Sequence, residues 1–187
     1  MLTVLFVCTG NICRSPLAEG FLADRSHRFL DDAVVARSAG TWARGGDPPV
    51  HESVLVARER GIDISHQRCA PLTAQKVRRA DLIVGMTEEH VEEIVRLDPG
   101  AAEKTFTLKE LASILSTMPP PAPGADPRPR ITEADDRRSP EHRGDVRDPL
   151  GLGEATYRDV AWEIEAAVDG IVAGLFGTED RPAAAEG

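Results

Sequence analysis

Two patterns of hydrophobic and polar positions alternate along the chain. Short, nearly all-apolar runs predict strands buried on both faces, and runs with apolar residues three or four apart predict amphipathic helices. In chain order, the predicted elements are a strand at 2–7, a helix opening at 15–16, a strand at 33–36, helices at 52–60 and 73–79, a strand at 82–86, a helix from 87 to about 97, a strand at 104–107 and helices at 108–115 and about 155–176. This alternation predicts a three-layer, doubly wound α/β sheet of about four parallel strands, with its site at the carboxyl ends of the strands.

Two segments do not fit the alternation. Residues of about 117–143 are rich in proline and in mixed charges and hold almost no apolar side chains, which predicts a surface insertion. Residues 178–187 are polar and alanine-rich, which predicts a flexible C-terminal tail. We therefore expect one domain over residues 1–177 that carries the insertion, in keeping with a chain of 187 residues.

Composition narrows the possible partners. The formal net charge of −9 disfavours a nucleic-acid partner, because binding phosphates along a backbone takes clustered Lys and Arg. No apolar run approaches the roughly 20 residues of a membrane helix, and the apolar start lacks the features of a signal peptide. We therefore expect a cytoplasmic protein, a monomer or weak dimer, without a membrane partner, whose three cysteines are thiols.

The acidity is unevenly distributed. Residues 154–187 hold eight acidic residues against two arginines, a net charge of −6. The excess acid therefore lies largely on the last predicted helix and the tail. It does not exclude a phosphate monoester as substrate.

The chemically informative segment lies between the first predicted strand and the first predicted helix. Five residues separate Cys8 from Arg14, enough for backbone N–H groups to wrap a tetrahedral oxyanion beside the positive end of a helix. Arg14 offers two parallel donors to phosphate oxygens, and these donors favour a thiolate nucleophile at Cys8. The other residues of the expected phosphate-binding loop are Thr9, Gly10, Asn11, Ile12, Cys13 and Ser15.

Gly10 and Asn11 suit the left-handed backbone that such a loop needs. Ser15 is placed to hydrogen-bond the sulfur of Cys8. The segment resembles the signature of the low-molecular-weight protein tyrosine phosphatase family, bacterial branch. The likeness covers most of the chain and includes Ser38–Thr41, Gly61–His66, Ala80–Met86 and Asp148–Pro149.

The resemblance implies a phosphocysteine mechanism on a phosphorylated protein substrate, with no metal and no cofactor. Cys8 attacks phosphorus, Arg14 binds the phosphoryl group, and Asp148 protonates the leaving group and then activates water. A positioned acid suits this reaction, since it contributes roughly 10²–10⁴-fold to the rate, and Pro149 biases Asp148 to an extended backbone. Asp145 is the competing carboxylate nearby.

The resemblance also implies supporting residues. Ser38 and His66, together with Asn11, match the polar set that holds the loop in shape. Trp42 matches one wall of the substrate cleft, and Leu150 supplies a second, apolar wall.

Two substrates remain open. Tyrosine-specific members carry aromatic residues directly after Asp-Pro, whereas this chain has Leu150 and Gly151. The segments 148–153, 86–87 and 106–110 resemble the protein-arginine phosphatases of the same fold. Those enzymes carry Thr where this chain has Ile12, and a branched apolar side chain suits an aromatic leaving group better. Phosphotyrosine is therefore the expected substrate and phosphoarginine the alternative.

Two activities of other classes are weighed against hydrolysis. A thiol-dependent arsenate reductase needs a downstream resolving cysteine, and Cys69 is the only cysteine after Cys13. Cys13 is also close enough in sequence to pair with Cys8 as a reversible oxidation lock. A non-catalytic phosphate-binding module needs neither a nucleophile nor an acid, so it accounts for the residues less well.

Overall fold

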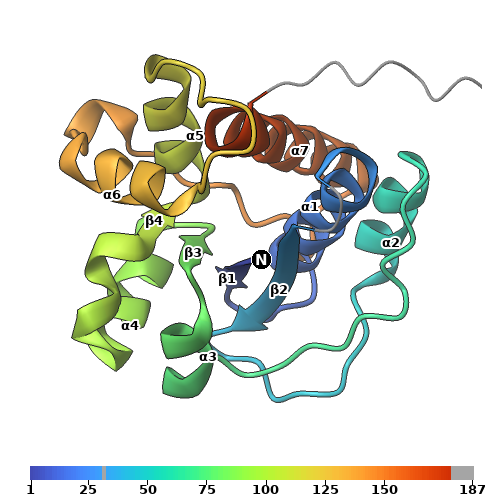
Figure 1. The fold of residues 1–187 in the computed structure, drawn as a ribbon. Coiled ribbons are helices and arrows are strands. Elements are labelled where there is room, and N and C mark those ends of the chain that lie inside the picture. The colour runs from blue at the N-terminus through green and yellow to red at the C-terminus, as the bar shows by residue number, and fades with distance from the viewer. Residues whose placement is uncertain (31–32, 178–187) are drawn as a thin grey trace, which may run out of the picture.

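The structure is a computed structural model that describes residues 1–30 and 33–177. Four parallel strands form one sheet in the order β2-β1-β3-β4, with helices on both faces, so the predicted α/β architecture is confirmed (Figure 1). The elements are β1 (Leu2–Cys8), α1 (Arg14–Phe29), β2 (Val34–Gly40), α2 (His51–Arg58), α3 (Ala74–Arg79), β3 (Leu82–Gly85), α4 (Glu88–Leu97), η1 (Pro99–Lys104), β4 (Thr105–Thr107), α5 (Leu108–Thr117), α6 (Arg128–Asp136), η2 (Pro140–His142) and α7 (Glu154–Phe176).

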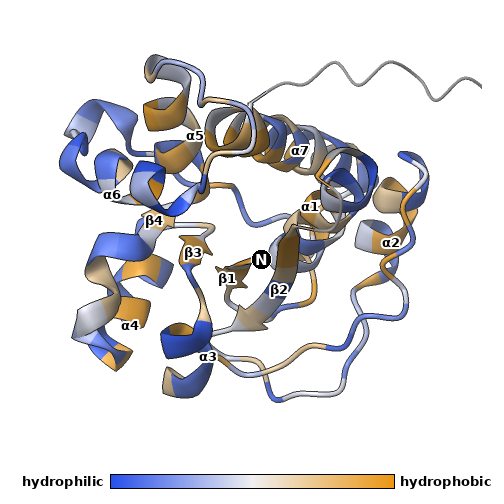
Figure 2. Ribbon diagram, viewed as in Figure 1, coloured by the Kyte–Doolittle hydropathy of each residue, from blue (hydrophilic) through white to orange (hydrophobic). Residues whose placement is uncertain are grey.

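Two helical layers of unequal size cover the sheet. Helices α1, α2, α5 and α7 pack together on one face, where most of the buried apolar residues lie. Helices α3 and α4 cover the other face, over a smaller apolar cluster. Figure 2 shows hydrophobic residues concentrated on the strands between these layers. The sheet is therefore shielded from water on both sides, as its nearly all-apolar strand sequences require.

The order of the strands determines where a site can form. β1 lies at the centre and pairs with β2 on one side and β3 on the other. The connection through α1 leads to β2, and the next strand, β3, returns to the opposite side of β1. The chain thus changes direction at the carboxyl end of β1, which is where ligands bind in open parallel sheets.

The second strand is longer than predicted. The prediction ended at Ala36, because the following Ser-Ala-Gly segment is typical of a turn, whereas β2 runs to Gly40. Its ladder with β1 continues until Cys8 pairs with Gly40. Pairing with the central strand therefore overrides the local turn preference.

The expected insertion at 117–143 contains a helix that the sequence pattern did not predict. Ile131 and Ala134 of α6 are buried in the main core. The Arg130 side chain donates hydrogen bonds to the carbonyl oxygens of Gly174, at 2.6 Å, and Pro119, at 2.9 Å. This part of the segment is fixed to the body of the protein, which corrects the expectation of a purely surface insertion. The predicted tail, 178–187, lies outside the described residues.

None of the described helices is both long enough and apolar enough to cross a bilayer.

Candidate active site

The segment between β1 and α1, here called the Cys8 loop (residues 8–15), forms a tight loop at the carboxyl end of the central strand. Cys8 ends β1, and α1 begins only six residues later, at Arg14. The first turn of α1 contains no acidic residue, and Cys13, at the N-cap, makes no side-chain capping hydrogen bond. The positive end of the helix dipole and its unpaired N–H groups therefore remain available to an anion.

Asn11 fixes the path of this loop. Its φ of 55° is the only left-handed value at a non-glycine residue in the described chain. Its amide nitrogen donates to the hydroxyls of Ser15, at 2.9 Å, and Ser38, at 2.8 Å. Its amide oxygen accepts from the backbone N–H of Ala70, at 2.8 Å. Asn11 thus connects the Cys8 loop to Ser38 of β2, and with 1% of Asn11 exposed these bonds are shielded from water.

The chain after β2 closes over the same loop. The backbone N–H groups of Thr41 and Trp42 donate to the carbonyl oxygens of Cys8 and Thr9, at 3.0 and 2.9 Å. This close approach needs a glycine at the end of β2. A Cβ atom on Gly40 would lie 2.6 Å from the Thr9 carbonyl oxygen, which is a steric clash with backbone.

The two cysteines of the loop have different surroundings. The sulfur of Cys8 lies 3.0 Å from the Ser15 hydroxyl and accepts from the backbone N–H of Asn11 at 3.3 Å, and such donors stabilise a thiolate. Cys13 instead lies 3.7 Å from the hydroxyl of Tyr157. Burial raises the pKa of Cys13 to about 11, so it stays a neutral thiol near pH 7. Of the two, Cys8 is therefore the one whose surroundings suit a nucleophile.

Arg14 and Asp148 meet at this loop although 134 positions separate them. The buried guanidinium donates to the Val146 carbonyl oxygen at 3.1 Å and to a carboxylate oxygen of Asp148 at 2.7 Å. The N–H of Val146 in turn donates to the carbonyl oxygen of Met86, just after β3. With 47% of its side chain exposed, Asp148 faces solvent as well as Arg14. A carboxylate, a guanidinium and a thiol thus come together at the Cys8 loop.

The competing carboxylate has another contact. Asp145 accepts a hydrogen bond from the backbone N–H of Glu88, at 2.8 Å, at the beginning of α4. A carboxylate at a helix N-terminus is stabilised there by the helix dipole. Asp145 therefore supports α4, and Asp148 is the carboxylate next to Arg14.

His66 is not where the resemblance placed it. It is exposed, and within the described residues no hydrogen bond joins it to the Cys8 loop. The hydroxyl of Ser38 donates instead to Glu19, at 2.5 Å. Burial raises the pKa of Glu19, and the hydrogen bond from Ser38 and the charges of Arg37 and His66 oppose this shift. Glu19, which the sequence analysis missed, accepts the hydrogen bond of Ser38 and so supports the loop through Ser38. His66 affects Glu19 only through its charge.

His90 is a second residue that the sequence analysis missed. Its Nε2 lies 3.0 Å from the Thr9 hydroxyl, and its Nδ1 lies 2.7 Å from the hydroxyl of Thr87, the N-cap of α4. Burial lowers the pKa of His90 to about 4, and the charge of Arg14 adds to the effect. The ring is neutral near pH 7, so it can donate through one nitrogen and accept through the other. It connects the Cys8 loop to α4.

Exposed apolar side chains lie on the two segments that contact the Cys8 loop. Trp42, whose N–H is bonded to the loop, is 76% exposed, and Leu150 and Leu152, just after Asp148, are 56% and 39% exposed. Ile12 is half-buried at the edge of the core. Trp42 and Leu150, which were expected to form walls of a substrate cleft, thus both expose apolar surface to solvent. Within residues 1–30 and 33–177, no three His, Cys, Asp or Glu side chains gather as metal ligands.

Comparisons with known proteins agree with this geometry. Residues 3–118 match the family model of the low molecular weight phosphotyrosine protein phosphatases. The chain is 32% identical over 166 residues to a protein-arginine-phosphatase of Geobacillus stearothermophilus, covering 89% of this chain and 90% of the relative. It is 33% identical over 173 residues to low molecular weight protein-tyrosine phosphatase A of Mycobacterium tuberculosis, covering 91% and 89%.

Solved structures show the same likeness. A low molecular weight protein tyrosine phosphatase from T. tengcongensis superimposes with a TM-score of 0.74 at 34% identity, covering 94% of this chain and 100% of that one. The arginine phosphatase from Geobacillus stearothermophilus superimposes with a TM-score of 0.73 at 30% identity, covering 94% and 93%.

Gly40→Ala tests the close packing of the loop against β2. The added methyl group pushes against Thr9, so we expect inorganic phosphate to bind at least about tenfold more weakly and the free energy of unfolding to fall by about 1–3 kcal/mol. Calorimetric titration and urea unfolding measure the two effects. Gly153→Ala is the matched control, because nothing lies within 4 Å of its Cβ position. Equal phosphate affinity in the two variants would contradict the packing argument.

The buried, neutral ring of His90 predicts loss of stability in acid. An unfolded histidine takes up a proton near pH 6.5, whereas folded His90 does so only near pH 4, so acid favours the unfolded chain. Between pH 7.5 and pH 5 this residue should lower the free energy of unfolding by about 2 kcal/mol. Urea unfolding at both pH values should show that the His90→Asn variant does not lose these ~2 kcal/mol. His51→Asn, at an exposed position of α2, should still lose this amount.

Proposed function

This chain belongs to the low molecular weight phosphotyrosine protein phosphatase family, and we propose that it hydrolyses phosphotyrosine in proteins through a phosphocysteine on Cys8. Members of the family are phosphoric monoester hydrolases. The observation that carries the proposal is the meeting of Cys8, Arg14 and Asp148 at one loop, with the Asp148 carboxylate 2.7 Å from the guanidinium. Phosphorylated proteins are the class of substrate that follows from the family.

In the first step, the Cys8 thiolate attacks phosphorus while the bond from phosphorus to the leaving oxygen breaks. Arg14 and the N–H groups of the Cys8 loop hold the non-bridging oxygens, where negative charge has to be stabilised. Asp148, in its protonated form, gives its proton to the leaving oxygen. Its exposed side chain and its contact with Arg14 put the carboxyl group at the mouth of the site.

In the second step, water attacks the phosphocysteine. Asp148, now a carboxylate, takes a proton from that water, and Cys8 leaves as a thiolate. The Ser15 hydroxyl, 3.0 Å from the sulfur, donates to the departing thiolate, and the N–H of Asn11 does the same. Inorganic phosphate is released and the starting enzyme is restored. No residue in this sequence of steps calls for a metal or a cofactor.

Exposed apolar side chains next to the Cys8 loop and Asp148 favour phosphotyrosine over phosphoarginine as the substrate. Trp42, whose N–H is bonded to the Cys8 loop, and Leu150 and Leu152, just after Asp148, expose apolar surface. Such surface packs against a phenyl ring and offers no negative charge to a guanidinium. Ile12 adds a branched apolar side chain within the loop itself.

Phosphoarginine is the second candidate because of specific relatives. The protein-arginine-phosphatase of Geobacillus stearothermophilus matches 89% of this chain, over nearly the whole of its own length. Arsenate reduction is not supported by Cys69, which is buried and whose backbone is bonded to Asp47 and Gly46. Hydrolysis is therefore the proposed reaction for either phosphorylated side chain.

We further propose that residues 1–177 form one catalytic domain that acts in the cytoplasm as a monomer or weak dimer, with neither nucleic acid nor membrane as partner. The three cysteines, all buried free thiols, suit a reducing compartment.

Asp148→Ala tests the general acid. A poor leaving group needs its proton more than a good one does, so we expect kcat/KM for phenyl phosphate to fall roughly 10²–10⁴-fold and kcat/KM for p-nitrophenyl phosphate much less. This ratio reports only the steps through departure of the leaving group, whereas kcat also contains the second step, in which Asp148 acts as base for both esters. Steady-state kinetics with both esters measures the difference. Asp145→Ala is the matched control and should leave both rates within about twofold. Equal slowing of the two esters by Asp148→Ala would remove Asp148 from the acid role, and turnover by Cys8→Ser would overturn the mechanism itself.

A panel of peptides tests the substrate. With one peptide sequence carrying phosphotyrosine, phosphoarginine or phosphoserine, we expect kcat/KM to be at least about tenfold higher for phosphotyrosine. Ile12→Thr should shift this ratio toward phosphoarginine, whereas Ile12→Val, which keeps the branched apolar shape, should leave it nearly unchanged. Higher kcat/KM for phosphoarginine in the unaltered enzyme would make the second candidate correct. Arsenate reduction, assayed with added thiols, should be undetectable.

A further inference from the structure

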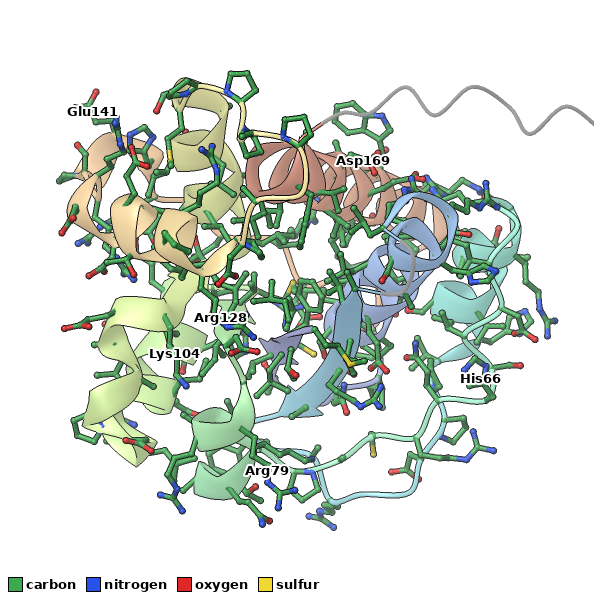
Figure 3. The ribbon with its side chains drawn as sticks, viewed as in Figure 1. His66, Arg79, Lys104, Arg128, Glu141 and Asp169 are labelled. Carbon is green, nitrogen blue, oxygen red and sulfur yellow. The ribbon has the colours of Figure 1, made fainter. Side chains whose placement is uncertain are left out.

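A cavity of about 860 Å³ lies beside β2, away from the Cys8 loop. Its walls come from β1, β2, α1, α3 and the chain between α2 and α3, and none of residues 8–15 lines it. Figure 3 labels His66 and Arg79, which come from the two segments on either side of β2. The cavity is open to solvent on one side, and its volume suffices for a small organic molecule and far exceeds the size of a single phosphate.

The charge of the cavity is opposite to that of the chain. Arg37, Arg68, Lys76 and Arg79 line it, and Glu19 is the one carboxylate among the lining residues. Four positive groups thus face one negative group in a protein whose formal net charge is −9. A concave surface lined with charge of one sign concentrates the potential and attracts ions of the opposite sign.

These four cations make no direct ion pair within the described chain, although the charge of Glu19 acts on Arg37 and Lys76. No salt bridge joins any of them to a carboxylate there, and the hydrogen bonds of Arg37, Arg68 and Lys76 go to backbone carbonyl oxygens. Arg78, beside Arg79 on α3, does pair with Asp98. Burial also lowers the pKa of Lys76, the effect expected of an ammonium group without enough compensating negative charge.

We propose that this cavity is a second anion-binding site, distinct from the Cys8 loop, that takes a small oxyanion carrying two or more negative charges. Guanidinium groups and an ammonium group bind phosphate and carboxylate oxygens through charge-assisted hydrogen bonds. An organic phosphate and a polycarboxylate share the required chemistry. The apolar part of the lining, Leu5, Val35 and Ala80, accommodates the carbon body of such a ligand.

The site is two hydrogen bonds away from the residue that fixes the catalytic loop. Glu19 accepts from Ser38, and Ser38 accepts from Asn11. An anion in the cavity disfavours the charged form of Glu19, because like charges repel. A neutral Glu19 is a weaker acceptor, so the hydrogen bond from the Ser38 hydroxyl to Glu19 becomes weaker. Occupation of the cavity therefore acts on the shape of the Cys8 loop.

The binding test uses enzyme whose Cys8 has been carboxymethylated with iodoacetate, which blocks the loop without a substitution. Calorimetric titration with pyrophosphate and with citrate at low salt should show one site per chain. If both ions bind, negative charge alone is enough for binding. If only pyrophosphate binds, the ligand class is an organic phosphate, and if only citrate binds, it is a polycarboxylate. Arg79→Ala should weaken binding by about tenfold or more, whereas Arg78→Ala, the matched control on the same helix, should change it by less than about threefold. Failure of both ions to bind, or equal losses of affinity in the two variants, would overturn the proposal.

A kinetic test addresses the action on the loop. An ion that merely competes at the Cys8 loop raises KM for p-nitrophenyl phosphate and leaves kcat unchanged. Pyrophosphate or citrate in the cavity should change kcat by about twofold or more, and Arg79→Ala should abolish this change while keeping the basal kcat. An unchanged kcat in the presence of the bound ion would overturn the action on the loop. Neither test depends on whether the substrate is phosphotyrosine or phosphoarginine.

Discussion

The hydrogen bonds of one buried side chain, Asn11, hold the catalytic loop in a backbone conformation that most residues avoid. A left-handed residue costs roughly 1–2 kcal/mol, less for asparagine, while each hydrogen bond contributes about 1 kcal/mol net. The Asn11 amide makes three such bonds, to Ser15, Ser38 and a backbone N–H. These outweigh the strain, and because the group is buried, loss of any partner would leave an unpaired polar atom. The direction of the loop N–H groups, and hence phosphate binding, follows from this balance.

The order of the strands brings Asp148 to the site, because the Cys8 loop itself contains no carboxylate. The loop itself provides the nucleophile and the cation, but the acid comes from a segment 134 positions further along. Asp148 reaches Arg14 because the chain at Val146 is bonded to Met86, directly after the strand next to β1. The catalytic set thus depends on β1 and β3 being neighbours with their carboxyl ends at the same edge of the sheet. The parallel order of the strands is therefore part of the mechanism.

The sequence predicted those parts of the molecule that follow from local pattern. The four strands, the helix after Cys8 and the Cys8 loop each have their signal within one short segment. The features that were not predicted correctly all depend on tertiary contacts. Helix α6 buries only two side chains, too few for a periodic apolar stripe, and His90 reaches Thr9 from a helix 81 positions away. Nothing local distinguishes Glu19 from an exposed acid on α1, and the position of His66 was carried over from a family pattern. A histidine three residues after an N-cap threonine was the one local signal available for His90.

The net charge of −9 illustrates how little a whole-chain sum says about a site. Exposed charges farther apart than about 8–10 Å are largely screened at physiological salt. Acidic residues on α7 therefore do not cancel the field of Arg14, which is buried among N–H groups, nor that of the cations beside β2. In both regions, positive groups lie next to a single carboxylate. Around Arg14 this carboxylate is the half-exposed Asp148, and a phosphoryl group can take over its contact. Beside β2 the single carboxylate, Glu19, is already engaged by Ser38, so the four cations there remain to be balanced by a ligand.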